Sequence, residues 1–152
     1  MIDIRIQSDD FDPGAELARL EALAVGAIAS FTGLVRGDDG LVAMTLEHYP
    51  AMTDAAVRKI ADEAARRWPL AGLMVIHRHG RLVPGDRIVF VATASSHRAA
   101  ALESCAFLID WLKTDAPFWK REEWADGSAR WVEAREADDT AKARWSRSNS
   151  RF

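Results

Sequence analysis

The stretch DRIVFVATASSHRAAALESCAFLIDWLKT, residues 86–114, places a strand pattern directly before the longest helical pattern of the chain. Its first ten residues are largely apolar, which predicts a central strand. From about His97 to Thr114 apolar residues recur at helical spacing, and Ser95 or Ser96 stands where an N-cap is expected. The stretch therefore predicts a buried strand followed by a helix with a broad apolar face.

Strand and turn patterns surround this stretch on both sides. Upstream, the ranges 3–7, 26–36, 41–49 and 71–80 have strand-like composition, and the turn sequence GDDG makes 26–36 and 41–49 read as a β-hairpin. The turn around Pro84 and Gly85 separates 71–80 from the central strand. Downstream, Pro117 ends the long helix, and FWKREEW and ARWVEAR flank the turn ADGS, so we expect a hairpin in which Trp119 and Trp131 meet.

Two further helices are predicted upstream. Asp12 and Pro13 are typical of an N-cap and a first helical position, and this helix should run to about Leu23. A second helix is expected from Met52 to Trp68, with Thr53 as its cap. The element order predicts an α+β fold: a mainly antiparallel sheet with hairpins, packed by about three helices.

Length and composition fit one domain, which we place at residues 1–135, with a loose tail at 136–152. The net charge of −3 gives no global reason to bind nucleic acid or an acidic membrane. Neither a secretory leader nor a membrane-spanning run is visible, so a cytoplasmic protein is expected. The single cysteine, Cys105, falls in the apolar helical pattern and is interpreted as a buried thiol.

The segment KTDAPFWKREEW, residues 113–124, holds two of only four lysines in a chain with 16 arginines. Lysine is the cation that loses its proton when desolvated, so Lys113 and Lys120 attract a catalytic interpretation. A bend at Pro117 would bring both ammonium groups together, with Phe118 and Trp119 as walls. The alternative is structural, because a lysine in the last turn also stabilises the helix dipole, and Glu122 and Glu123 supply ordinary ion-pair partners.

Two other places suit an anion. In FTGLVR, Arg36 follows a strand and precedes a flexible turn. In SSHRAA, His97 and Arg98 open the long helix, where free N–H groups attract phosphate or carboxylate; the alternative is that the serines only cap the helix. His77 and His79 alternate on one strand face, but no third metal ligand is evident nearby, so we expect no metal site.

Six segments together resemble one family, the large catalytic subunit of molybdopterin synthase. They are FTGLVR, LEHYPAMT, HRHGRLVPGD, SSHRAA, LKTDAPFWKRE and RWVEAR, in this order between residues 28 and 135. The resemblance implies a hammerhead-like α/β fold and a sulfurtransferase that needs no metal or cofactor. Many members have a lysine two residues before the arginine of the first motif, where this chain has Leu34.

The resemblance also implies substrates, partners and site residues. The substrate is cyclic pyranopterin monophosphate, which receives two sulfurs as a dithiolene. The sulfur comes from the C-terminal thiocarboxylate of a ubiquitin-like small subunit, in a heterotetramer built on a homodimer of large subunits. The family's site positions fall on catalytic Lys113 and Lys120 and on a substrate-binding set, namely Arg36, His97, Arg98, Arg121, Glu122 and Arg135.

Helix geometry adds a constraint to this set. His97 and Lys113 are 16 residues apart, or about 24 Å along a helix, which is too far for one small pterin to touch both. We therefore expect His97 and Arg98 of one subunit to complete the site that holds Lys113 and Lys120 of its dimer mate. Two rival functions stay open: a non-catalytic module that binds a partner's acidic C-terminal tail, and a hydrolase of a cyclic phosphate centred on SSHR.

Overall fold

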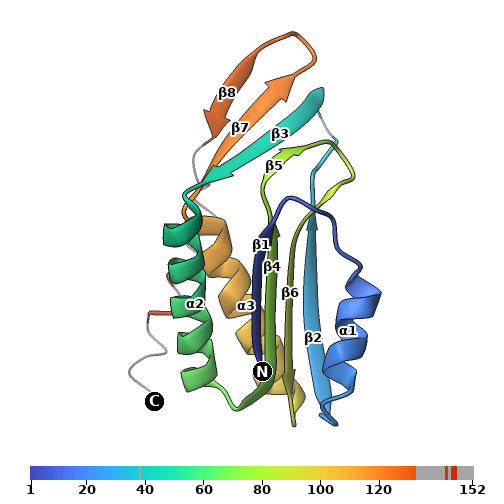
Figure 1. The fold of residues 1–152 in the computed structure, drawn as a ribbon, viewed down its shortest axis with the longest axis vertical. Helices are drawn as coiled ribbons and strands as arrows, with labels where there is room; N and C mark the ends of the chain where they lie inside the picture. Colours follow the sequence, from blue (N-terminus) through green and yellow to red (C-terminus); the bar gives the residue numbers. More distant parts are fainter. Residues whose placement is uncertain (38, 133–142, 144, 147–152) are drawn as a thin grey trace.

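A computed structural model describes residues 1–37, 39–132, 143, 145 and 146 (Figure 1). Within these residues three helices and eight strands form an α+β fold. Their bounds are β1 Ile2–Gln7, α1 Pro13–Glu21, β2 Ala27–Leu34, β3 Leu41–His48, α2 Pro50–Arg67, β4 Leu70–Arg78, β5 Gly80–Leu82, β6 Arg87–Ser95, α3 Arg98–Thr114, β7 Phe118–Trp124 and β8 Ala129–Val132. None of the described helices is long and apolar enough to cross a membrane.

The first sheet has the strand order β1-β4-β6-β2 and carries helices on both faces (Figure 1). Helices α2 and α3 cover one face, where Val57, Leu108 and Val91 belong to the larger core cluster. Helix α1 covers the other face, where Leu20 packs with Phe90. Burial on both faces explains why β6 is almost continuously apolar, so the predicted central strand is confirmed.

The second sheet has the order β5-β3-β7-β8 and lies beyond one end of the first (Figure 1). All of its pairings are antiparallel. Met44 and Leu46 of β3 are buried and join the larger core cluster, which anchors this sheet to the rest of the fold. The β7–β8 hairpin was predicted, whereas the short strand β5 was not.

The predicted hairpin of β2 with β3 is wrong, because the two strands belong to different sheets. β2 pairs with β6, and β3 pairs with β5 and β7. After β2 the chain continues along β6, since Val35 accepts a hydrogen bond from Gly85 N and donates one to Asp86 O, each at 2.9 Å. The GDDG segment therefore crosses between sheets. The sheets are mainly antiparallel, as predicted, with the parallel β1–β4 pair as the exception.

Two predicted helix caps are also wrong, while the Asp12 cap is confirmed by bonds from Gly14 N and Ala15 N. α2 begins at Pro50, so Thr53 lies inside the helix and is fully buried. α3 begins after His97, whose side chain makes no capping bond. The hydroxyl of Ser95 instead donates to the carbonyl of Pro69 at 2.7 Å.

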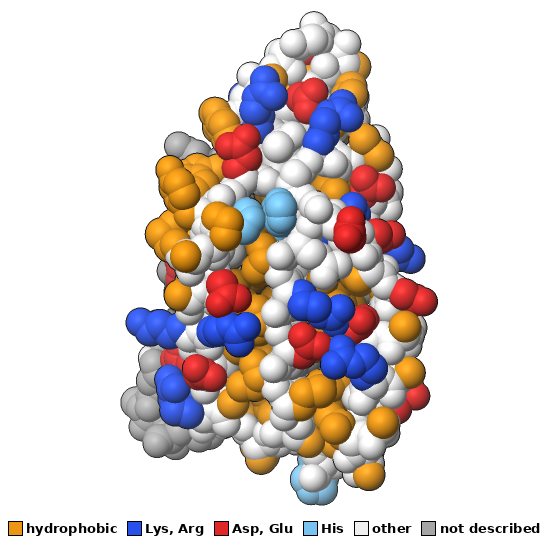
Figure 2. All heavy atoms as spheres, in the orientation of Figure 1, with side chains coloured by type: hydrophobic (Ala, Val, Ile, Leu, Met, Phe, Trp, Pro, Cys, Tyr) orange, Lys and Arg blue, Asp and Glu red, His pale blue; other side chains and the backbone are white. Residues whose placement is uncertain are grey.

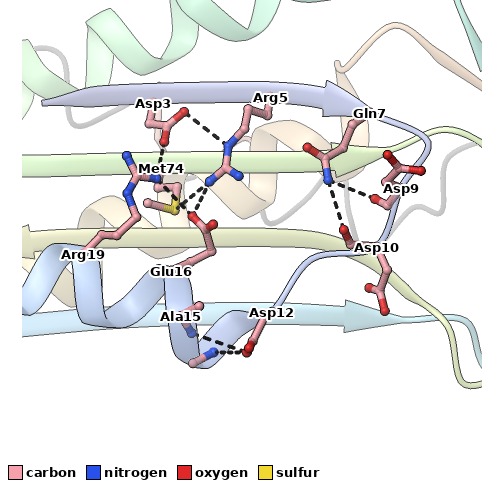
Figure 3. A network of polar contacts seen from close by, with 11 residues as sticks. Asp3, Arg5, Gln7, Asp9, Asp10, Asp12, Ala15, Glu16, Arg19 and Met74 are labelled. Atoms are coloured by element: carbon pink, nitrogen blue, oxygen red, sulfur yellow. Dashed lines mark hydrogen bonds and ion pairs between the residues drawn. The ribbon is translucent and has the colours of Figure 1, made fainter.

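An ion-pair network fastens α1 to β1 (Figure 3). Arg5 of β1 bonds to Glu16 of α1, and Arg19 of α1 bonds to Asp3 of β1 at 2.7 Å and to Glu16 at 3.2 Å. The network ties the covering helix α1 to the edge strand β1, and basic and acidic side chains are interspersed over this face of the molecule (Figure 2), so we assign these charges a structural role.

Trp145 shows that the tail is packed at one point rather than loose throughout. Its ring lies edge-on to Trp68 and Phe107, and its Nε1 donates to Asp110 Oδ2 at 2.6 Å. The carbonyl of Trp145 accepts from Arg67 Nη1 at 3.2 Å. Of the expected loose tail, residues 136–152, the structure describes only residues 143, 145 and 146, so the prediction for the rest lies outside the described residues.

Candidate functional site

Lys113 and Lys120 lie on either side of the corner between α3 and β7. Lys113 belongs to the last turn of α3, and Asp115 caps that helix. Lys120 lies on β7 opposite Leu46 of β3. Because alternate residues of a strand share a face, Phe118, Lys120 and Glu122 project to the side on which Leu46 is buried. The base of the Lys120 side chain is thus set against the core.

Both lysines act electrostatically on one buried imidazole, that of His77 at the end of β4. His77 is 7% exposed. Burial first, and then the positive charges of Lys113 and Lys120, lower the pKa of His77 to about 4. Lys113 and Lys120 therefore both lie close enough to His77 to affect its pKa, whereas their meeting in one catalytic site stays a prediction.

Aromatic rings line this corner. Phe118 stacks on His77 with ring centroids 3.9 Å apart, and His48 lies 5.6 Å from the same Phe118 ring. Phe118 thus packs beside the lysine corner, where it is able to form the predicted wall. Trp119 is not part of that wall, because it lies on the opposite face of β7, is 45% exposed and packs edge-on against Tyr49.

The place of the histidines in this corner does not follow from local sequence patterns, which offer His77 only as one of an alternating pair with His79. One signal is present: VIH ends an apolar strand, where a histidine is either buried or at a site. Among the described residues no group of three His, Cys, Asp or Glu side chains is placed to hold a metal ion.

Arg36 lies at the same end of the first sheet as His77. Gly33 pairs with Val89, which in turn pairs with His77, and Arg36 follows just beyond β2. The side chain of Arg36 is exposed, as a ligand contact requires. Gly33 has a packing role, because a Cβ there would come within 2.8 Å of Val89 Cγ1.

His97 and Arg98 lie at the opposite end of α3 from Lys113. α3 is one continuous helix from Arg98 to Thr114, so about 24 Å separates the two ends. Both residues are exposed, and neither Ser95 nor His97 caps the helix with its side chain. A single chain therefore does not bring His97 and Arg98 to the lysines.

Arg121 and Glu122 are neighbours in sequence but lie on opposite faces of β7. Glu122 shares the face of Lys120, whereas Arg121 lies opposite Trp131 on the exposed face. Trp131 pairs with Arg121 and not with Trp119, which corrects the predicted tryptophan pair; Trp119 lies opposite Glu47. Arg135 falls outside the described residues.

Cys105 is excluded from the chemistry of the site. It is 7% exposed within α3, and burial raises the pKa of its thiol to about 11. A thiol with this pKa holds almost no reactive thiolate at neutral pH. The prediction of a buried structural thiol is confirmed.

Comparisons with known proteins agree with this geometry. The family model described as MoaE protein matches residues 6–115. The molybdopterin synthase catalytic subunit of Mesorhizobium japonicum is 53% identical over 150 residues, covering 96% of this chain and 94% of the relative. The solved structure of the molybdopterin biosynthesis MoaE protein from Burkholderia ambifaria is 55% identical, with a TM-score of 0.83 and coverage of 96% and 99%.

A solved structure of lower sequence identity supports the fold alone. It is to a structure from Helicobacter pylori described as a protein–protein complex of subunits 1 and 2 of molybdopterin-converting factor. That chain is 23% identical, with a TM-score of 0.69 and coverage of 89% and 90%. On the strength of the family model and the closer relatives, the chain belongs to the MoaE family, that of the molybdopterin synthase catalytic subunits.

Proposed function

We propose that this chain is the catalytic subunit of a cytoplasmic molybdopterin synthase. It takes sulfur from the C-terminal thiocarboxylate of a ubiquitin-like small subunit and adds it to cyclic pyranopterin monophosphate, forming the molybdopterin dithiolene. The observation that carries this proposal is the placement of Lys113 and Lys120 on either side of the corner between α3 and β7, beside buried His77, in a chain of this family.

The lysines supply the positive charge that the reaction requires. The thiocarboxylate is an anion, and its acyl group passes through a tetrahedral intermediate that is also anionic. Preorganised cations in a partly desolvated corner stabilise such species far better than water does. Lys113 and Lys120 hold the tail and this intermediate, and Glu122, on the same face of β7 as Lys120, orients the lysine.

The phosphate and pterin are held by groups from two subunits. Arg36 lies at the end of the first sheet that is next to Lys113 and Lys120 of the same subunit. His97 and Arg98 lie at the opposite end of α3. A homodimer in which these ends meet completes the site and gives each pocket a phosphate seat at a helix N-terminus. Arg135 is proposed as a further anion contact.

The exposed face of the second sheet is proposed to receive the body of the small subunit. Tyr49 and Trp119 lie edge-on with ring centroids 5.3 Å apart and are 66% and 45% exposed; Trp131 is 54% exposed beside Arg121. Large aromatics and arginine are the residues that anchor protein interfaces. A partner docked there lies across β7 from Lys120, so its tail passes around the edge of the sheet to reach that lysine, and two such partners complete a heterotetramer.

The decisive experiment supplies cyclic pyranopterin monophosphate and a thiocarboxylated small subunit to the purified chain and measures dithiolene product. Lys120→Ala should lose turnover by about 100-fold or more, the scale for removing one preorganised charge, and by a larger factor than it loses small-subunit affinity. Lys59→Ala, on the exposed face of α2, is the matched control and should be fully active.

The same assay separates the rival functions. A docking module would lose affinity in Lys120→Ala and form no product even as wild type. A cyclic-phosphate hydrolase would consume the substrate without a sulfur donor. Either result would refute the proposed function.

A further inference from the structure

Four rings contact one another in series where the two sheets meet; the His77–Phe118 pair is stacked and the other two pairs are tilted. His77 lies 3.9 Å from Phe118 with an interplanar angle of 16°, Phe118 lies 5.6 Å from His48, and His48 lies 4.6 Å from His79. We call this set (His48, His77, His79 and Phe118) the imidazole stack. It joins the end of β4 to β3 and to the start of β7, two residues before Lys120.

The tautomer of His77 follows from its hydrogen bond. Its Nδ1 lies 2.8 Å from the carbonyl oxygen of Arg78, and a carbonyl only accepts hydrogen bonds. Nδ1 must therefore carry the proton. In the neutral ring, the lone pair then resides on Nε2, so His77 offers one acceptor atom within a buried site.

Burial and the nearby positive charges keep the His77 ring neutral. Burial lowers the pKa of His77 most, the hydrogen bond to the Arg78 carbonyl raises it, and the charges of Lys113, Lys120 and His48 lower it further. A general base for neutral pH needs a pKa near 7. His77, with a pKa of about 4, is too weak a base for that task, but a neutral acceptor is still able to orient an ammonium group.

We propose that His77 is a positioning residue for the lysine pair: its ring holds Phe118 in place, and its Nε2 lone pair orients a lysine ammonium group. That the oriented lysine takes part in sulfur transfer rests on the proposed function. A neutral acceptor suits the task better than a carboxylate would. A carboxylate would fix the lysine as a permanent ion pair, whereas an imidazole directs the ammonium group without cancelling the charge needed by an anionic substrate.

The first test concerns the lysines themselves and needs no activity. Limiting acetic anhydride labels the free-amine form of lysine, and peptide mass spectrometry gives the labelling of Lys113 and Lys120 relative to Lys59, an exposed lysine of α2. In His77→Phe, which keeps a stacking ring but removes the acceptor, this ratio should rise about tenfold for the lysine concerned, since one pKa unit is a factor of ten.

Matched variants separate the acceptor from the ring. His77→Gln keeps a polar side chain able to accept, so its labelling ratio should lie closer to that of wild type. His79→Phe, at the other end of the imidazole stack, should label as wild type does. An unchanged ratio for both lysines in His77→Phe would overturn the proposal, as would ¹⁵N NMR of the wild-type protein that finds the proton of His77 on Nε2.

Turnover provides the second readout. In the synthase assay His77→Phe should lower kcat by about 10- to 100-fold, the effect of a small misplacement of a catalytic group, with KM for the small subunit unchanged. His77→Gln should recover part of this loss. Unchanged kcat in His77→Phe would overturn the positioning role. Failure of the wild-type protein to make dithiolene would instead refute the proposed function, and the labelling and NMR results would still decide the role of His77.

Discussion

Ser95 donates its hydroxyl proton to the carbonyl oxygen of Pro69 at 2.7 Å, which ties the end of β6 to the connection between α2 and β4. Ser95 is 1% exposed, so Ser95→Ala removes a hydrogen bond made by a buried hydroxyl, although Pro69 itself is exposed. The free energy of unfolding should fall by about 0.5–1.5 kcal/mol, the usual net contribution of such a bond. Urea denaturation measures it.

Ser96 is the matched control for this prediction, because it is adjacent and exposed. Ser96→Ala should change the free energy of unfolding by less than about 0.5 kcal/mol. Equal effects of the two substitutions would show that the hydroxyl of Ser95 acts as a replaceable surface group, contrary to its observed bond.

The stability of the fold should depend on pH through His77. Its pKa is about 4 when folded and near the ordinary 6.5 when unfolded, so between these values the unfolded chain binds more protons. Stability contributed by the neutral ring is therefore present above about pH 6.5 and lost as the pH falls to 4, by about 3 kcal/mol at 1.4 kcal/mol per pKa unit. Burial also lowers the pKa of His48, with the same sign.

Urea denaturation at a series of pH values from 4 to 7 checks this dependence. In His77→Phe the free energy of unfolding should change much less with pH over that range than in wild type. In His79→Phe it should change as steeply as in wild type. Parallel profiles for wild type and His77→Phe would mean that the imidazole of His77 titrates normally in the folded protein.

Mixed dimers test the shared site. In a heterodimer of Lys113→Ala with Arg98→Ala, one pocket carries both substitutions and the other carries neither, so activity should reappear although each homodimer is inactive. Lys113→Ala mixed with Lys120→Ala is the control, because both lysines lie in the same corner and neither pocket is intact. Absence of rescue in a verified Lys113→Ala and Arg98→Ala heterodimer would rule out the shared arrangement.

Local sequence patterns were sufficient to predict features that depend on a single helix, strand or turn. The apolar run of β6 and the helical pattern of α3 predicted a central strand and a long helix, and the turn ADGS predicted the hairpin of β7 with β8. Each of these features depends on residues close together in the chain. Periodicity and turn chemistry report such features directly.

Features that depend on distant partners were missed for the same reason. A glycine-containing turn between two strand patterns normally indicates a hairpin. GDDG instead joins strands of different sheets, because β2 pairs with β6 and β3 pairs with β7. Ser95 has the sequence position of a helix cap, but its hydroxyl donates a hydrogen bond to the carbonyl of Pro69, 26 residues away. The stacked rings of His77 and Phe118 belong to residues 41 positions apart, and no local sequence pattern predicts such a contact.

The exposed aromatics of the second sheet provide the last prediction. Trp131 is 54% exposed and lies opposite Arg121, on the face proposed to receive the small subunit. Trp131→Ala should weaken small-subunit binding by about 30-fold, the effect of removing an interface anchor worth about 2 kcal/mol. Because the lysine corner is untouched, kcat at saturating small subunit should stay unchanged. Titration calorimetry and the synthase assay separate the two effects.

Leu102 supplies the control for that titration, since it is an equally prominent apolar side chain, 61% exposed, but lies on α3. Leu102→Ala should bind the small subunit as wild type does. If Trp131→Ala also binds normally, the partner docks elsewhere, and the tail must reach Lys120 from another side of the molecule. If kcat falls instead, Trp131 acts on the lysine corner through β7, and the two faces of that strand are coupled.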